Sequence, residues 1–204
     1  MAQTIMKDLE GYFTPEQIDR ILAATKNRRD RMLVMFGWRT GRRISEMLGV
    51  KKKDIDFDKG LIKFHILKKK NKDFLKLKPI DSGLLQALLE YTEDMKEDDY
   101  IFKTTYKKDS PITRRQAYNI VRGAAEDAKI AFVGLKPPHP HHLRHSFAIH
   151  FLRNTKNRTT ALVVLQRLLE HSNINTTVTY LQFSQEDLRE DLDNVFNKKK
   201  EDIK

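Results

Sequence analysis

Hydrophobic residues recur at helical spacing along most of the chain and alternate with polar residues in one central interval. Thr14, Pro15 and Gln17 indicate the start of a first helix, because they supply an N-cap, a proline at the first helical position and a capping-box partner. Gly37 and Gly41 interrupt the next helical pattern, so we expect both to break it. The spacing predicts further helices over residues 28–36, around 44–48, from 82 onward, and over 113–131, 142–153, 160–170, 176–182 and from 184 onward. In the helix from residue 82, the residues expected to face the core are Leu84, Leu85, Leu88 and Leu89.

Alternation with a period of two marks the interval from residue 55 to residue 78. The runs 55–57 and 61–67 flank Asp58-Lys59-Gly60, a turn sequence typical of hairpins. A third run, 74–78, stops at Pro79, and the lysine-rich stretch 68–72 forms a basic tip before it. We therefore predict a small three-stranded antiparallel sheet within a mostly helical α+β domain.

Composition and charge narrow the functional classes. The chain has 204 residues, long enough for one domain with its own core, and no apolar run approaches the roughly 20 residues of a membrane span. It has no cysteine, which excludes disulfides and thiol chemistry, and no apolar signal at its N-terminus. We expect a soluble, intracellular protein. The net charge of +11 favours a polyanionic partner, most often nucleic acid, although a lysine-rich proteome would give a similar excess.

Arg43 is a first candidate for chemistry. It follows the Gly41 break at the expected start of a helix, where the helix dipole favours anions over cations. An arginine at this place makes sense if it faces a bound phosphate. The alternative is a solvated basic turn shared with Arg39 and Arg42.

Histidines and an arginine gather after the prolines at 137, 138 and 140. His141 and Arg144 are three residues apart, so they share a helix face and can donate to the same phosphate oxygens. The alternatives are a surface pair or a metal site. The metal site is disfavoured by the proline-broken spacing and by the lack of cysteines and nearby carboxylates. The histidines of this cluster are His139, His141, His142 and His145.

Three further candidates are weaker when each is taken alone. His171 follows a strongly apolar helix, whose C-terminus favours a protonated imidazole, but it could equally stabilise its own helix end. Tyr180 lies on a short polar helix, where a tyrosine usually packs against its neighbours. Lys69 within 68–72 could give its proton to a leaving alkoxide, or the run could be only a solvated tip.

Taken in order, these motifs resemble the catalytic domain of the tyrosine recombinases, the family of phage integrases and Xer-type recombinases. The first family box, T-G-x-R-x-S-E, is matched by residues 40–46, and the second, H-x-L-R-H-S/T-F-A, by residues 141–148. The third has L-G-H-S with a tyrosine nine residues after the histidine, matched by 169–172 and Tyr180. The lysine-rich tip falls between the second and third strands, as in the family. The resemblance covers residues 12 to about 196.

The resemblance implies a site-specific recombinase or integrase that cleaves and rejoins DNA through a 3′-phosphotyrosyl intermediate. It implies no metal and no ATP, and the sequence has neither a Walker-type glycine loop nor an evident carboxylate cluster for magnesium. The partners would be double-stranded DNA and further copies of the chain, as a dimer or tetramer on DNA, in the cytoplasm and at the nucleoid, with no membrane. The implied site residues are Tyr180 as nucleophile, Arg43, Arg144 and His171 on the scissile phosphate, His141 in proton transfer at the nucleophile, Lys69 as proton donor to the leaving 5′ oxygen, and Glu46 in support.

Some features depart from the family pattern. Glu170 stands where the family has glycine, so the preceding helix must end without the residue that most easily adopts a left-handed cap. The segment 154–159 is a few residues longer than usual. We expect an arm over 1–11, a catalytic domain over 12–183, and a C-terminal helix with a charged tail over 184–204. The family's N-terminal DNA-clamping domain is then absent, so the chain is either a fragment or grips DNA differently.

Two other functions stay open at this point. The same residues would serve a type IB topoisomerase-like enzyme that nicks and rejoins DNA. The fold could also belong to a DNA-binding regulator that has lost catalysis.

Overall fold

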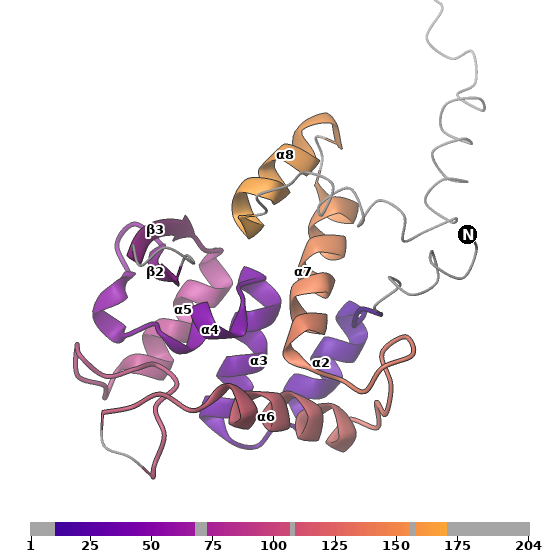
Figure 1. Ribbon diagram of the computed structural model, residues 1–204, viewed down its shortest axis with the longest axis horizontal. Helices are drawn as coiled ribbons and strands as arrows, with labels where there is room; N and C mark the ends of the chain where they lie inside the picture. Colours follow the sequence, from indigo (N-terminus) through magenta and orange to yellow (C-terminus); the bar gives the residue numbers. More distant parts are fainter. Residues whose placement is uncertain (1–10, 68–72, 107–108, 156–157, 171–204) are drawn as a thin grey trace, which may run out of the picture.

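The computed structural model describes residues 11–67, 73–106, 109–155 and 158–170. The described part is mostly helical and carries one small sheet, which confirms the predicted fold class (Figure 1). Within these residues, no helix is long and apolar enough to cross a membrane. The elements in chain order are α2 (Pro15–Ala24), α3 (Arg28–Thr40), α4 (Ile44–Leu48), a 3-10 turn η2 (Lys52–Asp54), β1 (Ile55–Asp56), β2 (Leu61–Leu67), β3 (Asp73–Pro79), α5 (Ser82–Thr92), α6 (Arg114–Asp127), α7 (Pro140–Asn154) and α8 (Arg158–Leu169).

Capping boxes start helices α2 and α6: the Thr14 box predicted above, and a second formed by Thr113 and Gln116, which the same sequence rule also predicts. The Thr14 hydroxyl accepts from the Gln17 N–H at 3.3 Å, and the Gln17 side chain accepts from the Thr14 N–H at 2.9 Å. Thr113 and Gln116 make the same reciprocal pair at 3.1 and 2.8 Å. Each pair satisfies backbone donors that a helix start otherwise leaves without a partner.

Helix α3 lies at the centre of the molecule and packs against α2, α5, α6 and α7 (Figure 1). The expectation that Gly37 breaks this helix is wrong, because α3 continues to Thr40. Gly37 is buried, and a Cβ built there would lie 2.9 Å from Leu143 Cδ1 of α7. The glycine therefore costs some helix propensity but permits close approach of α3 and α7. Gly41 does end the helix, in the left-handed region at φ 60°.

Helix α6 is shorter than predicted and ends at Asp127 instead of near residue 131. Lys129 adopts a left-handed conformation at φ 61°, its N–H donates to Glu126 O, and the Ile130 N–H donates to Ala125 O at 2.8 Å. These bonds form the Schellman pattern that commonly closes a helix. Its usual residue there is glycine, so the stop is hard to predict from a lysine. In helix α5, Leu89 is 50% exposed, so the expectation that it faces the core is wrong.

The sheet has the predicted antiparallel order β1-β2-β3, and Gly60 takes the left-handed position of the first turn. Strand β3 orients its side chains unusually. Phe64 of β2 is fully buried and pairs with Lys76, and directly opposed residues project from the same face of a sheet. Lys76 and Lys78 therefore lie on the inner side, whereas Leu75 and Leu77 are 56% and 59% exposed.

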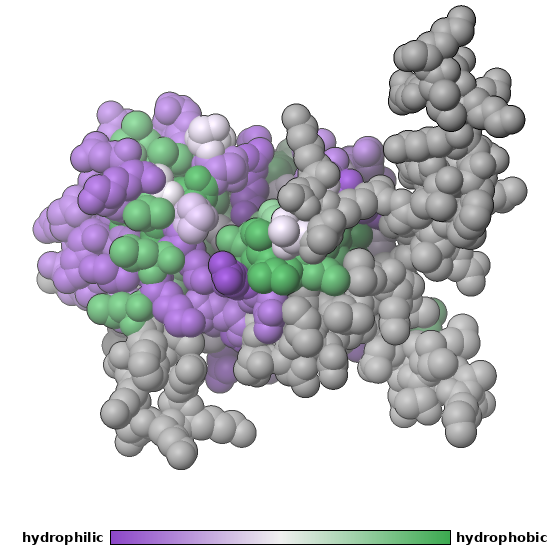
Figure 2. Space-filling view, turned by 90° about the horizontal axis from the view of Figure 1, so that it is seen from above, coloured by the Kyte–Doolittle hydropathy of each residue, from purple (hydrophilic) through white to green (hydrophobic). Residues whose placement is uncertain are grey.

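Three hydrophobic clusters form the core. The largest joins α3, α4, the sheet and α5, and the second joins α2, α3, α6 and α7. A smaller cluster joins α7 to α8 and includes Ala148, Leu165 and Leu169. The view from the α8 side shows a hydrophobic group at the middle of a largely hydrophilic face (Figure 2). Val163 and Val164 of α8, at 45% and 41% exposure, are among the exposed hydrophobic residues.

Candidate active site

Arg43 is the residue that precedes helix α4, which confirms its predicted place at a helix start. Its side chain is 49% exposed, whereas that of Glu46, one turn later, is 5% exposed. Glu46 accepts from the Arg43 backbone N–H at 3.3 Å through Oε2 and from Arg43 Nη1 at 3.1 Å through Oε1. The glutamate thus orients the arginine, which is the geometry that its expected supporting role requires.

Arg144 joins three segments of the chain. It lies on α7 and is only 2% exposed. Its Nη1 donates to the carbonyl oxygen of Gly41 at 2.7 Å, and its Nη2 donates to that of Leu169 at 2.8 Å. The left-handed turn after α3 and the end of α8 thereby fix the guanidinium, and both carbonyls are helix-end acceptors that need a donor.

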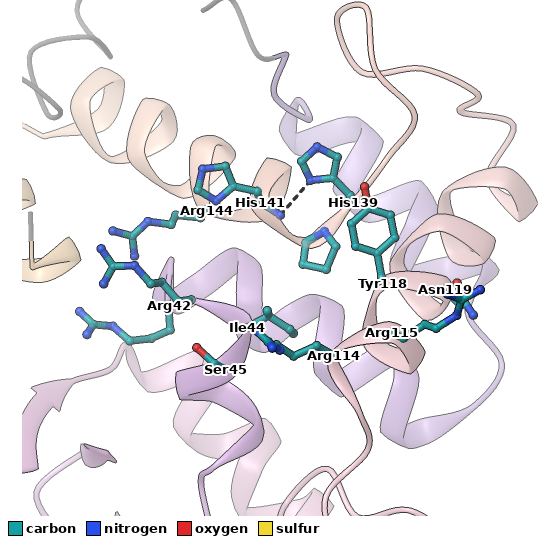
Figure 3. A pocket seen from close by; sticks show the side chains of 12 residues that line it. Arg42, Ile44, Ser45, Arg114, Arg115, Tyr118, Asn119, His139, His141 and Arg144 are labelled. Atoms are coloured by element: carbon teal, nitrogen blue, oxygen red, sulfur yellow. Dashed lines mark hydrogen bonds between the residues drawn. The ribbon is translucent and has the colours of Figure 1, made fainter. Parts of the chain in front are cut away.

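His141 lies in the first turn of α7, on the same helix as Arg144 (Figure 3). Its backbone N–H donates to Nδ1 of His139, the N-cap residue, at 3.2 Å, and its side chain is exposed. The ring of His141 meets that of His145 edge to face at 4.4 Å. The start of a helix of this length favours an anion, which suits a role beside a phosphate.

Arg43, His141 and Arg144 line one pocket of about 690 Å³, although they come from segments about one hundred residues apart in sequence (Figure 3). Helix α6 forms the other wall with Arg114, Arg115, Tyr118 and Asn119. A concave surface lined by several arginines and histidines can bind a phosphodiester.

Sequence reasoning missed the α6 wall. The ring of Tyr118 stacks on that of His139 with centroids 5.5 Å apart, which joins α6 to the start of α7. Arg114 and Tyr118 are four residues apart directly after the Thr113 cap, so they share a helix face. That spacing is the signal that could have indicated them.

Arg42 differs most from what the sequence suggested. It belongs to no solvated turn but is 3% exposed, with its guanidinium 5.1 Å from the ring centre of Phe64. Its Nη1 lies 3.5 Å from Glu46 Oε2 and 3.9 Å from Glu170 Oε1. Burial lowers the pKa of Arg42, and the two carboxylates oppose that shift. An arginine stays protonated at neutral pH even so.

Three predicted site residues, Lys69, His171 and Tyr180, lie outside the described residues, so their placement is not tested. Within the described ranges, no group of three or more histidine, aspartate or glutamate side chains could hold a metal ion, and this includes the histidines around position 141.

Comparison with known proteins identifies the class. Residues 11–187 match the model of the phage integrase family, and the chain belongs to that family. The resemblance noted from the sequence is therefore confirmed, and the described fold is that of tyrosine recombinase catalytic domains.

Individual relatives carry more specific names. The probable integrase/recombinase YoeC of Bacillus subtilis (strain 168) is 37% identical over 164 residues, which cover 80% of this chain and 83% of YoeC. The tyrosine recombinase XerC of Staphylococcus aureus is 32% identical over 189 residues, which cover 91% of this chain and 58% of XerC. A solved structure of the XerH site-specific recombinase bound to palindromic difH substrate matches with a TM-score of 0.71 at 22% identity, over 92% of this chain and 54% of that one. The chain thus spans less than two thirds of the Xer proteins.

Proposed function

We propose that this protein is a site-specific DNA recombinase that cleaves and rejoins strands through Tyr180. The observation that carries the proposal is the convergence of Arg43, His141 and Arg144 on one pocket. Family membership supports the same reaction, since relatives over most of this chain are named recombinases or integrases.

The reaction needs no external energy source. The Tyr180 oxygen attacks the scissile phosphorus, the bond to the 5′ oxygen breaks, and Lys69 gives that oxygen a proton. The product is a 3′-phosphotyrosyl bond and a free 5′ hydroxyl, and the reverse steps rejoin the strand. His141 takes part in proton transfer at the nucleophile.

Cations around the phosphate can offset the main energetic cost of the reaction, which is ionisation of the tyrosine nucleophile. A tyrosine with a pKa of about 10 is ionised to about one part in a thousand at pH 7, a deficit of about 4 kcal/mol. Each well-placed donor to a developing oxyanion is worth about 3–4 kcal/mol. Arg43 and Arg144 with His171 can therefore stabilise the transition state without a metal.

Double-stranded DNA is the proposed partner. The net charge of +11 and the arginines of the α6 wall favour a polyphosphate backbone. The related XerH fold was solved on a palindromic site. A palindrome presents two equal half-sites, which suits self-association of this chain on DNA.

Covalent trapping tests the proposal. Wild type and Tyr180→Phe are mixed with duplexes of candidate attachment sites that carry a nick next to the cleavage position, so that the 5′ fragment diffuses away. We expect a DNA-linked band on a denaturing gel for wild type only. Salt-sensitive DNA binding without such a band on a broad panel of duplexes would contradict the proposal and favour a regulator. Relaxed supercoiled DNA without recombinant products would favour a topoisomerase.

A further inference from the structure

Glu170 occupies a backbone position that does not suit it. It follows α8 with φ 57°, in the left-handed region where a side chain costs about 1–2 kcal/mol. Such strain persists only where the surroundings hold the residue in place. The side chain is 9% exposed, so the holding contacts are internal.

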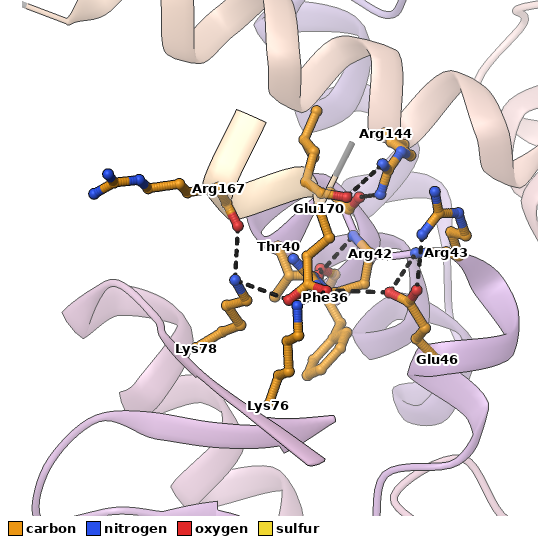
Figure 4. A network of polar contacts seen from close by, with 12 residues as sticks. Phe36, Thr40, Arg42, Arg43, Glu46, Lys76, Lys78, Arg144, Arg167 and Glu170 are labelled. Atoms are coloured by element: carbon orange, nitrogen blue, oxygen red, sulfur yellow. Dashed lines mark hydrogen bonds and ion pairs between the residues drawn. The ribbon is translucent and has the colours of Figure 1, made fainter. Parts of the chain in front are cut away.

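The carboxylate of Glu170 lies among three cations (Figure 4). Lys76 Nζ lies 2.7 Å from Oε2, Lys78 Nζ lies 2.9 Å from Oε1, and Arg42 Nη1 lies 3.9 Å from Oε1. Lys78 also donates to the carbonyl oxygen of Arg167 in α8 at 2.6 Å. Strand β3 and the end of α8 are thereby joined by charged contacts.

The inward lysines of β3 explain why this carboxylate is needed. They share the sheet face of the fully buried Phe64, and an uncompensated ammonium there is costly for Lys78, whose side chain is only 17% exposed, more than for the 41% exposed Lys76. Burial raises the pKa of Glu170, but the contacts from Lys76 and Lys78 outweigh it and leave the pKa below its ordinary value. The group is therefore ionised at neutral pH.

The same contacts continue to both phosphate-binding arginines. Arg42, which faces Glu170, also faces Glu46, and Glu46 orients Arg43. On the other side, the carbonyl of Leu169, the residue before Glu170, accepts from Arg144. His171 follows Glu170 directly in the sequence. Figure 4 shows this chain of contacts from β3 to the two arginines.

We propose that Glu170 is a positioning residue for strand cleavage. By tying the end of α8 to β3 and to Arg42, its carboxylate sets where Arg43 and Arg144 meet the scissile phosphate. The inference rests on the proposed function and assigns Glu170 no contact with DNA.

The test separates positioning from binding. The first-order rate of covalent adduct formation at saturating DNA is measured together with the Kd for the same DNA. Glu170→Gln keeps the size of the side chain but removes its charge, and we expect a rate about tenfold lower or more, since each 1.4 kcal/mol is tenfold. The Kd should change less than about threefold. Glu170→Gly, which relieves the backbone strain while losing the same ion pairs, should be slowed similarly because it also lacks the carboxylate.

Two comparisons distinguish this role from plain stabilisation. Lys78→Gln and Glu170→Gln should be non-additive in the rate, because both remove the same ion pair. Tyr91→Phe, which loses a hydroxyl bond to Ile101 O in another part of the fold, should lower the melting temperature without changing the rate.

The possible results decide between the two proposals. A Tyr180-dependent adduct formed at the wild-type rate by either Glu170 variant would overturn this inference alone. Additive effects, or a Kd that weakens as much as the rate falls, would overturn it as well. If wild type forms no adduct on any duplex, the proposed function fails and this inference fails with it.

Discussion

Replacing Gly41 by alanine should destabilise the fold and displace Arg144, one of the proposed phosphate-binding residues. Gly41 holds the left-handed position at the end of α3, with φ 60°. A Cβ there would lie 2.4 Å from Phe147 Cδ1 and 2.9 Å from Leu169 Cδ2. Its carbonyl oxygen accepts from Arg144. Strain, crowding and a shifted hydrogen bond therefore arise from one added methyl group.

The magnitude follows from two terms. The left-handed conformation costs an alanine about 1–2 kcal/mol, and overpacking a tight core costs about 1–3 kcal/mol. The free energy of unfolding should thus fall by about 2–5 kcal/mol, and the melting temperature by about 2–4 °C for each kcal/mol. Gly123→Ala is the matched control. Gly123 lies within α6, nothing stands within 4 Å of its built Cβ, and alanine should stabilise that helix by about 0.8–1 kcal/mol.

Urea unfolding followed by far-ultraviolet circular dichroism measures both variants under the same conditions. The urea midpoint should fall for Gly41→Ala and rise for Gly123→Ala. The rate of covalent adduct formation by Gly41→Ala should fall together with its stability. A Gly41→Ala midpoint equal to that of wild type would refute the account of this turn. A large loss in Gly123→Ala would refute the helix argument used for the control.

Three further results are expected. Ser146→Ala should lower the free energy of unfolding by about 1–3 kcal/mol, measured by thermal or urea melts. The buried Phe13 N–H, which donates to the Ser146 hydroxyl at 2.7 Å, would lose its acceptor. An unchanged melt would contradict this prediction. Burial raises the pKa of Tyr91 to about 12. The unfolded chain loses that proton at about pH 10, so stability should fall as the pH rises between these values, by at most about 2 kcal/mol given its partial exposure. Urea melts from pH 9 to 12 should show this extra loss in wild type but not in Tyr91→Phe, and parallel losses would contradict it. Arg114→Gln and Arg115→Gln should each reduce the slope of log affinity against log salt by about 0.9 if each contacts one phosphate, and unchanged slopes would remove α6 from the DNA surface.

Local rules in the sequence predicted the parts of the fold that depend on neighbours along the chain. The Thr14 and Thr113 boxes bond within three residues, and the turn at Gly60 joins adjacent strands. The nearby glycine break also correctly predicted that Arg43 lies at a helix start. The order of the motifs along the chain also indicated the family, although no single motif did so alone. Comparison with the family model confirmed this prediction.

Local sequence rules could not predict features that depend on contacts between segments far apart in the chain. Gly37 looks like a helix breaker until Leu143 of α7 is seen beside it. From its neighbours in sequence, Arg42 is expected in a solvated turn. Its burial depends partly on the carboxylate of Glu170, which lies 128 positions later in the chain. The inward lysines of β3 need the same partner, and an alternating strand pattern alone does not say which face turns inward. The roles of all the implied site residues remain predictions, and Lys69, His171 and Tyr180 also lie outside the described residues.

The bond between Phe13 and Ser146 has a mechanical consequence. Phe13, just before α2, donates through its backbone to Ser146 of α7, and Ser146 in turn donates to the carbonyl of His142. The Phe13 ring also meets the His142 ring edge to face at 6.0 Å. Phe13, and with it the start of α2, is thus tethered to the helix that carries His141 and Arg144. A displacement of the backbone at Phe13 therefore acts on α7 as well as on α2, the helix that follows it in the chain.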